Sequence, residues 1–350
     1  MAAQLLDLAG DTADHRISLE PEGATPSQIA LELNTVRLRD LSTARAGIST
    51  LLCAPFALHG AGVADLAEEH SLVATLLAAG IDRLFLVNWR SASPQMRFLG
   101  IDAYLADLNV LVDHIGGAVD LVGLCQGGWL SLLYAARFPG KVRKLVMAGA
   151  PVDIAAQPSG LSTMANTTPL AIFQSLVKAG DGRVIGRHIA RLWGTDLPDA
   201  EDIRRSLQAA EPIGSPAFAR LEATFNSWNA WTLDLPGTYY LEVIEKLYKR
   251  NELAAGNFVA LGQKIDLSCL RLPIYLLAGD ADEVVAPQQL LALARLVGTR
   301  PESLCSELVP SDHLGLFMGK RILGEYWPRV VRWMKQVDPA PDQHVPQPEY

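Results

Sequence analysis

The feature that most constrains this chain is the alternation of short apolar runs with amphipathic segments. In two of the intervening segments, 65–79 and 101–115, apolar residues recur every three or four positions, which predicts helices. Strands that alternate with helices in this way predict an α/β fold, with a mostly parallel central sheet covered by helices on both faces. The runs expected to form strands buried on both faces are 49–57, 83–89, 119–124, 144–148, 273–278 and 304–309.

The alternation stops after residue 152. Residues 153–268 have a mainly helical pattern interrupted by prolines, and the strand pattern resumes at 273–278. An insertion between two core strands at this point predicts a helical cap over the carboxyl ends of the strands, where open α/β sheets bind ligands. The expected organisation is a core formed by 1–152 and 269–337, a cap formed by 153–268, and a proline-rich, polar, disordered tail at 338–350.

Composition and charge exclude several classes of protein. The formal net charge of −8 over 350 residues argues against nucleic acid or anionic membrane surfaces as partners. No apolar run approaches the roughly 20 residues of a membrane span, and the N-terminus lacks the basic region of a signal peptide. The four cysteines form no CxxC motif, so we expect neither a zinc site nor a disulfide framework, but a reducing compartment.

The segment Gly123-Leu124-Cys125-Gln126-Gly127 joins an expected strand to an expected helix. Glycines two positions to either side of a central residue are typical of a nucleophile elbow, a sharp turn that lifts the central side chain above the sheet. A serine usually occupies the centre, and Cys125 therefore predicts a thiol nucleophile whose thiolate the following helix N-terminus favours. The backbone N–H of Gln126 would then point toward a developing oxyanion. The alternative is a buried structural cysteine.

The partners of an elbow nucleophile follow it in the order acid, then histidine. The loop after 273–278 offers Asp280 and Asp282, and we prefer Asp282 because the following 284–287 segment resembles the one that anchors the acid loop in many hydrolases. Asp280 remains the second choice, and a turn-shaping role for both is the alternative. His313 lies in the loop beyond the last strand, where the general base is expected. The predicted catalytic set is Cys125, Asp282 and His313.

A second glycine-containing turn lies at 59–70. Gly60 and Gly62 resemble the start of a dinucleotide-binding turn, but the third glycine position holds Asp65, whose charge would repel a pyrophosphate. The next strand also ends without an acid for a ribose. We therefore reject dinucleotide binding, and we assign the His59-Gly60 step to the oxyanion side of the pocket, as in many hydrolases.

At these residues the chain resembles the polyhydroxyalkanoate synthases of the α/β-hydrolase superfamily, particularly the short kind that works with a second subunit. The resemblance implies a polyester-extending acyltransferase, in which the cysteine takes a hydroxyacyl group from a coenzyme A thioester. Histidine and aspartate then activate the thiol and the incoming hydroxyl. It implies no metal, and no cofactor apart from the coenzyme A thioester as substrate. The matching segments are GLCQGG, YAARFPGKVRKLV, WTLDLPGTYYLEVIEKLYKRNEL in the expected cap, KIDLSCLRLPIY and DHLGLFMG.

The chain departs from this family at several positions. Trp129 stands where a small residue is usual, Glu283 follows the acid, Asp312 replaces a glycine, and the His59 loop lacks the family's asparagine. Because of these departures, the alternative function is that of a hydrolase of the same fold, such as an intracellular depolymerase, thioesterase or esterase. A non-catalytic granule- or partner-binding relative is the third alternative. The resemblance also implies a cytoplasmic protein, free or at polyester granules, that forms a homodimer or pairs with a second synthase subunit.

Overall fold

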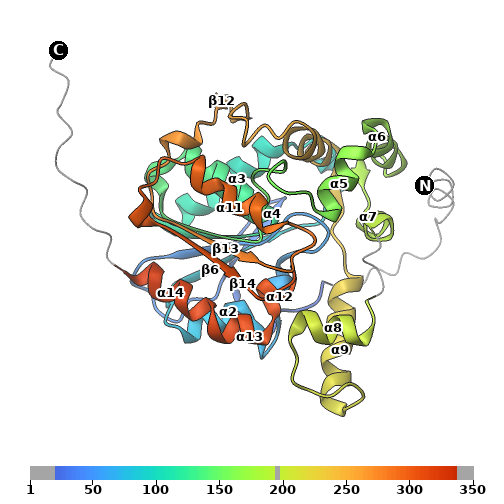
Figure 1. Cartoon of the computed structure of the whole chain (residues 1–350), viewed down its shortest axis with the longest axis vertical. Helices are drawn as coiled ribbons and strands as arrows, with labels where there is room; N and C mark the ends of the chain where they lie inside the picture. The colour runs from blue at the N-terminus through green and yellow to red at the C-terminus, as the bar shows by residue number, and fades with distance from the viewer. Residues whose placement is uncertain (1–19, 194–197, 337–350) are drawn as a thin grey trace.

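The computed structural model describes residues 20–193 and 198–336, so the tail predicted at 338–350 lies outside the described residues. Within them, eight strands form one sheet in the order β1-β2-β6-β3-β7-β8-β13-β14 (Figure 1). The pairs β1–β2 and β2–β6 are antiparallel, and the pairs from β6 to β14 are parallel, which confirms a mostly parallel sheet. The strands are β1 (Gln28–Glu32), β2 (Val36–Asp40), β3 (Thr50–Cys53), β6 (Leu84–Trp89), β7 (Val119–Leu124), β8 (Val142–Ala148), β13 (Ile274–Gly279) and β14 (Leu304–Val309).

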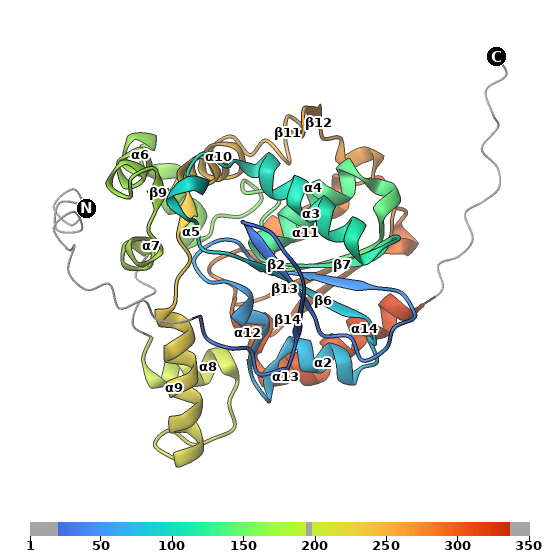
Figure 2. The same cartoon turned by 180° about the vertical axis from the view of Figure 1, so that it is seen from behind.

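Helices cover both faces of the sheet. One face carries α3 (Ile101–Ile115), α4 (Gln126–Arg137) and α11 (Pro287–Leu291), and the other carries α2 (Leu72–Ala78), α13 (Lys320–Glu325) and α14 (Trp327–Lys335) (Figures 1 and 2). Every residue of β3, β6, β7 and β13 is buried, because these central strands have a helical layer on each side. The continuous apolar runs of the sequence are the consequence of this double coverage.

Two sequence predictions were wrong in detail. The helix expected over 65–79 begins only at Leu72, and the residues before it form a small hairpin of β4 (Asp65–Ala67) and β5 (His70–Ser71). The buried Asp65 carboxylate accepts hydrogen bonds from Thr25 and Ser71, and the Ser71 side chain caps α2, which fixes the later start. Strand β14 is not buried on both faces, because it is the edge strand and is half exposed.

The chain between the neighbouring strands β8 and β13 is mainly helical. It holds α5 (Gly160–Thr167), α6 (Leu170–Ala179), α7 (Gly186–Trp193), α8 (Ala200–Leu207), α9 (Pro216–Ala230), α10 (Gly237–Glu242) and a π-helix, η4 (Val243–Lys249). It also holds two pairs of short antiparallel strands: β9 (Arg183–Val184) with β10 (Leu235–Pro236), and β11 (Val259–Ala260) with β12 (Gln263–Lys264). Helices α5 to α9 gather at one end of the sheet (Figures 1 and 2). The domain boundaries after residues 152 and 268 stay predictions.

Candidate active site

Cys125 occupies a strained turn between β7 and α4. Its backbone has φ 48° and ψ −120°, a combination that L-residues rarely adopt. The turn is tight enough that a Cβ at Gly127 would collide with the carbonyl oxygens of Cys53 and Ala54, and a Cβ at Gly123 would lie 2.5 Å from the Gly128 Cα. The glycines at these positions are therefore required by the close approach of α4 to β7 and β3. This is the local geometry of a nucleophile elbow.

Cys125 differs from the other cysteines in its surroundings. Its side chain is partly accessible, whereas Cys53 is fully buried and burial raises the pKa of its thiol to about 12. Cys269 is exposed, and Cys305 lies on the edge strand. Only Cys125 stands on the elbow.

His313 and Asp282 come from the loops that follow the neighbouring parallel strands β14 and β13. The His313 Nδ1 lies 2.7 Å from the Asp282 Oδ2, and both side chains are buried. The other carboxylate oxygen, Oδ1, accepts the backbone N–H groups of Val284 (2.9 Å) and Val285 (2.8 Å). These two bonds fix the carboxylate, and the carboxylate in turn orients the imidazole ring.

His313 also interacts with Cys125. Burial acts to lower the pKa of His313, but the charges of Asp282 and Cys125, together with a hydrogen bond to each, hold this pKa well above its usual value. Because Nδ1 faces the carboxylate, the Nε2 side of the ring faces the thiol. The structure therefore brings Cys125, His313 and Asp282 together in one chain of contacts.

Asp280 does not take part in this chain. Its side chain is exposed, and its Oδ1 accepts the backbone N–H of Ser311 at 3.2 Å, which ties the two loops together. Asp312, which stands where a glycine was expected, accepts hydrogen bonds from the Gly315 N–H (2.8 Å) and the Ser206 hydroxyl (2.7 Å). It thus links the His313 loop to α8 and to the start of α12 (Gly315–Met318).

Gln126 extends from the elbow into a network of buried polar groups. The Trp129 indole N–H donates to Gln126 Oε1, and Gln126 Nε2 donates to the Tyr248 hydroxyl at 3.1 Å. Trp129 is fully buried and packs beside Phe258. The bulky residue of the elbow helix therefore faces the interior and holds the Gln126 amide.

An apolar pocket lies beside the elbow, between the sheet and the helices that follow β8. Its walls include Ala57, in the loop after β3, and Gln126, the first residue of α4. Among the described residues, the Ala57 N–H has no hydrogen-bond partner, and the first N–H groups of a helix have none within it. The full lining is Phe56, Ala57, Gln126, Leu161, Met164, Ala165, Ile189, Leu235, Tyr239, Tyr240, Val243, Ile244 and Tyr248.

His59 does not line this pocket. Its Nδ1 lies 3.3 Å from the Trp231 carbonyl oxygen, and its ring stacks on Trp228 at 4.3 Å between centroids. Burial lowers the pKa of His59 to about 4, against the opposing effect of the hydrogen bond to Trp231, so the ring is neutral near pH 7. The structure places His59 against Trp228 and Trp231, which follow β8 in the chain. No sequence pattern indicated Ala57. Tyr248 lies within the matching segment 231–253, but nothing in the sequence distinguished it from the other residues there.

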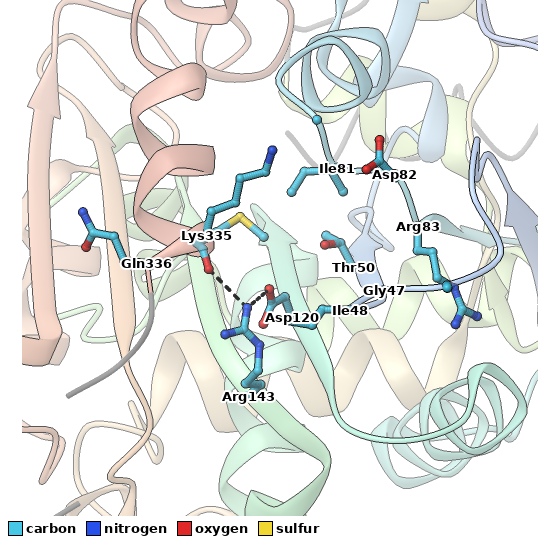
Figure 3. A pocket seen from close by; sticks show the side chains of 13 residues that line it. Gly47, Ile48, Thr50, Ile81, Asp82, Arg83, Asp120, Arg143, Lys335 and Gln336 are labelled. Atoms are coloured by element: carbon cyan, nitrogen blue, oxygen red, sulfur yellow. Dashed lines mark hydrogen bonds and ion pairs between the residues drawn. The ribbon is translucent and has the colours of Figure 1, made fainter. Parts of the chain in front are cut away.

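A second pocket opens at the opposite end of the sheet, near the starts of β3, β6, β7 and β8 (Figure 3). There Arg143 forms an ion pair with the buried Asp120 and donates to the Met334 carbonyl oxygen at 3.2 Å. In α/β sheets the chemistry lies at the carboxyl ends of the strands. This pocket lies at their amino ends, remote from Cys125.

The described residues contain no cluster of three or more His, Cys, Asp or Glu side chains arranged to hold a metal ion. None of the helices in the described ranges has the length and apolar character that a bilayer crossing requires. Arg204 and Arg205 pair with Glu201 and Asp202 on the exposed side of α8.

Comparison with known proteins gives consistent results. Residues 82–320 match the family model of the alpha/beta hydrolase fold. The chain is 31% identical to the poly(3-hydroxyalkanoate) polymerase subunit PhaC of Synechocystis, over 78% of this chain and 74% of that protein. It is 24% identical to the PhaC subunit of Haloferax mediterranei, over 98% and 72%. Among solved structures it resembles a monoacylglycerol lipase from Paleococcus ferrophilus, with a TM-score of 0.56, 16% identity, and coverage of 85% and 98%.

Proposed function

The chain belongs to the poly(3-hydroxyalkanoate) polymerase family of the α/β-hydrolase fold, and from that premise we propose that it moves 3-hydroxyacyl groups from coenzyme A thioesters onto a growing polyester through Cys125. One observation carries the residue assignment: His313 contacts Cys125 on one side of its ring and lies 2.7 Å from Asp282 on the other. A thiol, a base and an orienting acid in series are the machinery of nucleophilic acyl transfer.

In the first half of the reaction, the Cys125 sulfur attacks the thioester carbonyl. The proton of the thiol resides on His313, whose raised pKa suits it to hold that proton until it is needed. The carbon–sulfur bond to coenzyme A breaks, and the departing thiolate takes the proton from His313. The product is an acyl-Cys125 thioester, which is close in energy to the thioester that was consumed.

In the second half, the hydroxyl group of a polyester end, or of a second hydroxyacyl unit, attacks the acyl-Cys125 carbonyl. His313 accepts the hydroxyl proton, a new ester bond forms, and Cys125 leaves as the thiolate paired with the imidazolium. A cysteine suits this reaction better than a serine, because the acyl-enzyme remains an activated thioester that an alcohol can still attack. Asp282 stabilises the imidazolium in both halves.

The carbonyl oxygen carries negative charge in both tetrahedral intermediates. The backbone N–H groups of Gln126 and Ala57 are the proposed donors to this oxygen, since both residues line the pocket beside Cys125. Sequence analysis assigned the second donor to the His59 region. The burial of His59 against Trp228 and Trp231 supports a structural role for that side chain instead.

Hydrolysis of the acyl-enzyme is the competing outcome, because water can replace the hydroxyl in the second half. The apolar lining contributed by the residues after β8 supports acyl transfer, since a pocket that excludes water preserves the thioester. Because the relatives are named as poly(3-hydroxyalkanoate) polymerase subunits, we also propose that the protein acts at polyester granules in the cytoplasm. Several relatives are named as subunits, which supports a second subunit or a second copy of this chain as partner.

Incubation of the full chain with 3-hydroxybutyryl-coenzyme A tests the proposal. We expect thiol release to exceed free 3-hydroxybutyrate, with the difference recovered as oligomeric ester by mass spectrometry. Free acid equal to the thiol released, with no oligomer, would establish a thioesterase. Cys125→Ala should release no thiol, and Cys269→Ala, which removes an exposed cysteine, should match the wild type.

A further inference from the structure

Three tyrosines line the apolar pocket beside Cys125, and their hydroxyl groups differ in how they are bonded. The Tyr239 hydroxyl donates to the Phe56 carbonyl oxygen at 3.4 Å, so its hydrogen is used. The Tyr240 hydroxyl is buried and has no partner among the described residues. The Tyr248 hydroxyl accepts a hydrogen bond from Gln126, and its own hydrogen has no acceptor in the described parts of the chain.

The direction of the hydrogen bonds around Gln126 follows from Trp129. An indole N–H can only donate, so the Gln126 atom that faces Trp129 must be the carbonyl oxygen. The amide nitrogen therefore faces Tyr248 and donates to its oxygen. Because a lone pair of the Tyr248 oxygen is occupied in this way, the phenol is left as a donor with its hydrogen available to the pocket.

The backbone around Tyr248 is unusual. Tyr248 belongs to η4, a π-helix of seven residues that continues directly from α10. π-Helical turns are rare and are frequently found at functional sites. Ile244 and Tyr248, both on η4, line the pocket together.

We propose that Tyr248 donates a hydrogen bond to the oxygen at the 3-position of the acyl group carried by Cys125, and that Gln126 and Trp129 act as positioning residues for this phenol. The inference rests on the proposed function and names a residue that sets its specificity. In the proposed function, the thioester carbonyl oxygen is already assigned two backbone donors, the N–H groups of Gln126 and Ala57. Apart from the three phenols and the Gln126 amide, the remaining wall is apolar, so a 3-hydroxyl or 3-ester oxygen is the group that a phenol donor there would recognise.

The surroundings of the three phenols favour Tyr248 over Tyr240. Burial raises the pKa of both hydroxyls. The negative charge of Cys125 further raises the pKa of Tyr248, but it has no effect on the pKa of Tyr240. The charge of Cys125 also raises the pKa of Tyr239, but the hydroxyl hydrogen of Tyr239 is already donated to the Phe56 carbonyl oxygen. Tyr248 is therefore the phenol that is both near the nucleophile and free to donate.

The test compares acylation of Cys125 by 3-hydroxybutyryl-coenzyme A and by butyryl-coenzyme A, which lacks the 3-oxygen. Single-turnover rates on the full chain are followed by mass spectrometry of the acyl-enzyme. We expect Tyr248→Phe to lower kcat/KM for the hydroxyacyl substrate by roughly 10- to 100-fold and to change the butyryl rate by about twofold or less. Tyr240→Phe, the matched control in the same pocket, should leave the ratio of the two rates unchanged.

The positioning role is tested by a double-mutant cycle. Trp129→Phe removes the indole N–H that fixes the Gln126 amide, so it should lower the same ratio in the same direction. In the Tyr248→Phe background, Trp129→Phe should produce no further change in the ratio, because the phenol it positions is already gone. Thermal melting of each variant separates this effect from a loss of folding.

The proposal would be overturned if Tyr248→Phe lowered the rates for both substrates equally, so that their ratio stayed unchanged. It would also be overturned if Tyr240→Phe lowered the rate for the hydroxyacyl substrate selectively. If the wild type is acylated by neither thioester, the proposed function fails, and a separate measurement still decides the role of Tyr248. Methyl 3-hydroxybutyrate should then protect Cys125 from iodoacetamide better than methyl butyrate does. Loss of that difference in Tyr248→Phe supports the proposal, whereas equal protection of the wild type overturns it.

Discussion

The Nδ1 of His313 lies 2.7 Å from the Oδ2 of Asp282, although the two residues are 31 positions apart and stand on different loops. The strands that precede these loops, β13 and β14, are parallel neighbours in register from Ile274 and Leu304 to Gly279 and Val309. Because the strands end level with each other, the loops that leave them meet at the same edge of the sheet. Cys125, which follows β7 at that edge, completes the contact.

Replacement of Cys125 by alanine should abolish thiol release from 3-hydroxybutyryl-coenzyme A while leaving the circular dichroism spectrum unchanged. The substitution removes the nucleophile but little packing volume, since the side chain is partly accessible. Cys125→Ser should also be badly impaired, because a hydroxyl ionises far less readily than a thiol. Retention of most of the activity in Cys125→Ala would refute the assignment of the nucleophile.

Substitutions at His313 and Asp282 should both lower kcat severely, and the loss should be smaller at Asp282. We expect His313→Ala to lower kcat by roughly 1,000-fold or more and Asp282→Asn by roughly 100-fold, because an orienting acid contributes less than the base itself. Asp280→Asn is the matched control: it is on the same loop but bonded to the Ser311 N–H, and it should stay within about twofold of wild type. If Asp280→Asn lost activity while Asp282→Asn kept it, the orienting acid would be Asp280 and not Asp282.

The contribution of His313 to stability should fall as the pH rises. Its pKa in the folded protein is well above the unfolded value of about 6.5, because Asp282 and Cys125 outweigh the opposing effect of burial. The folded state therefore binds this proton more tightly, and the resulting stabilisation is complete below the unfolded pKa and lost as the pH passes through the folded one. Urea unfolding of wild type and His313→Gln should show a difference that is largest below about pH 6.5 and shrinks as the pH rises above it.

His114 provides the control for this measurement, since it is an exposed histidine near the end of α3. His114→Gln should not reproduce the pH-dependent difference. A difference between wild type and His313→Gln that grows with pH would mean that the folded protein holds His313 neutral.

Gly127→Ala should destabilise the protein and distort the elbow. A Cβ at this position meets the backbone of Cys53 and Ala54, which cannot move without disturbing β3. We expect a loss of about 1–3 kcal/mol in the free energy of unfolding, and a large loss of activity because Cys125 shifts. Gly140→Ala, at a glycine with open space around it, should change stability by less than about 1 kcal/mol and leave activity unchanged. Equal behaviour of the two variants would show that the elbow tolerates a side chain.

The sequence alone predicted what depends on local patterns. The run into Cys125 and the flanking glycines indicated the elbow, because a turn this tight excludes side chains at fixed offsets. Helix α3 has the predicted bounds, since its apolar residues recur with helical spacing. The sheet and its helical layers followed from the alternation of these patterns.

The tertiary structure decided what depends on neighbours distant in the sequence. The sequence favoured Asp282 over Asp280 only by the resemblance of the 284–287 segment. The position of His313 distinguishes the two directly, because a hydrogen bond needs one carboxylate within about 3 Å of the ring. Trp129 was recognised as a departure from the family pattern, but its contact with Gln126, and through it with Tyr248, depends on how α4 packs against η4. The sequence determines which chemical groups a segment carries, whereas their distances and directions are set by the packing of elements that the sequence places far apart.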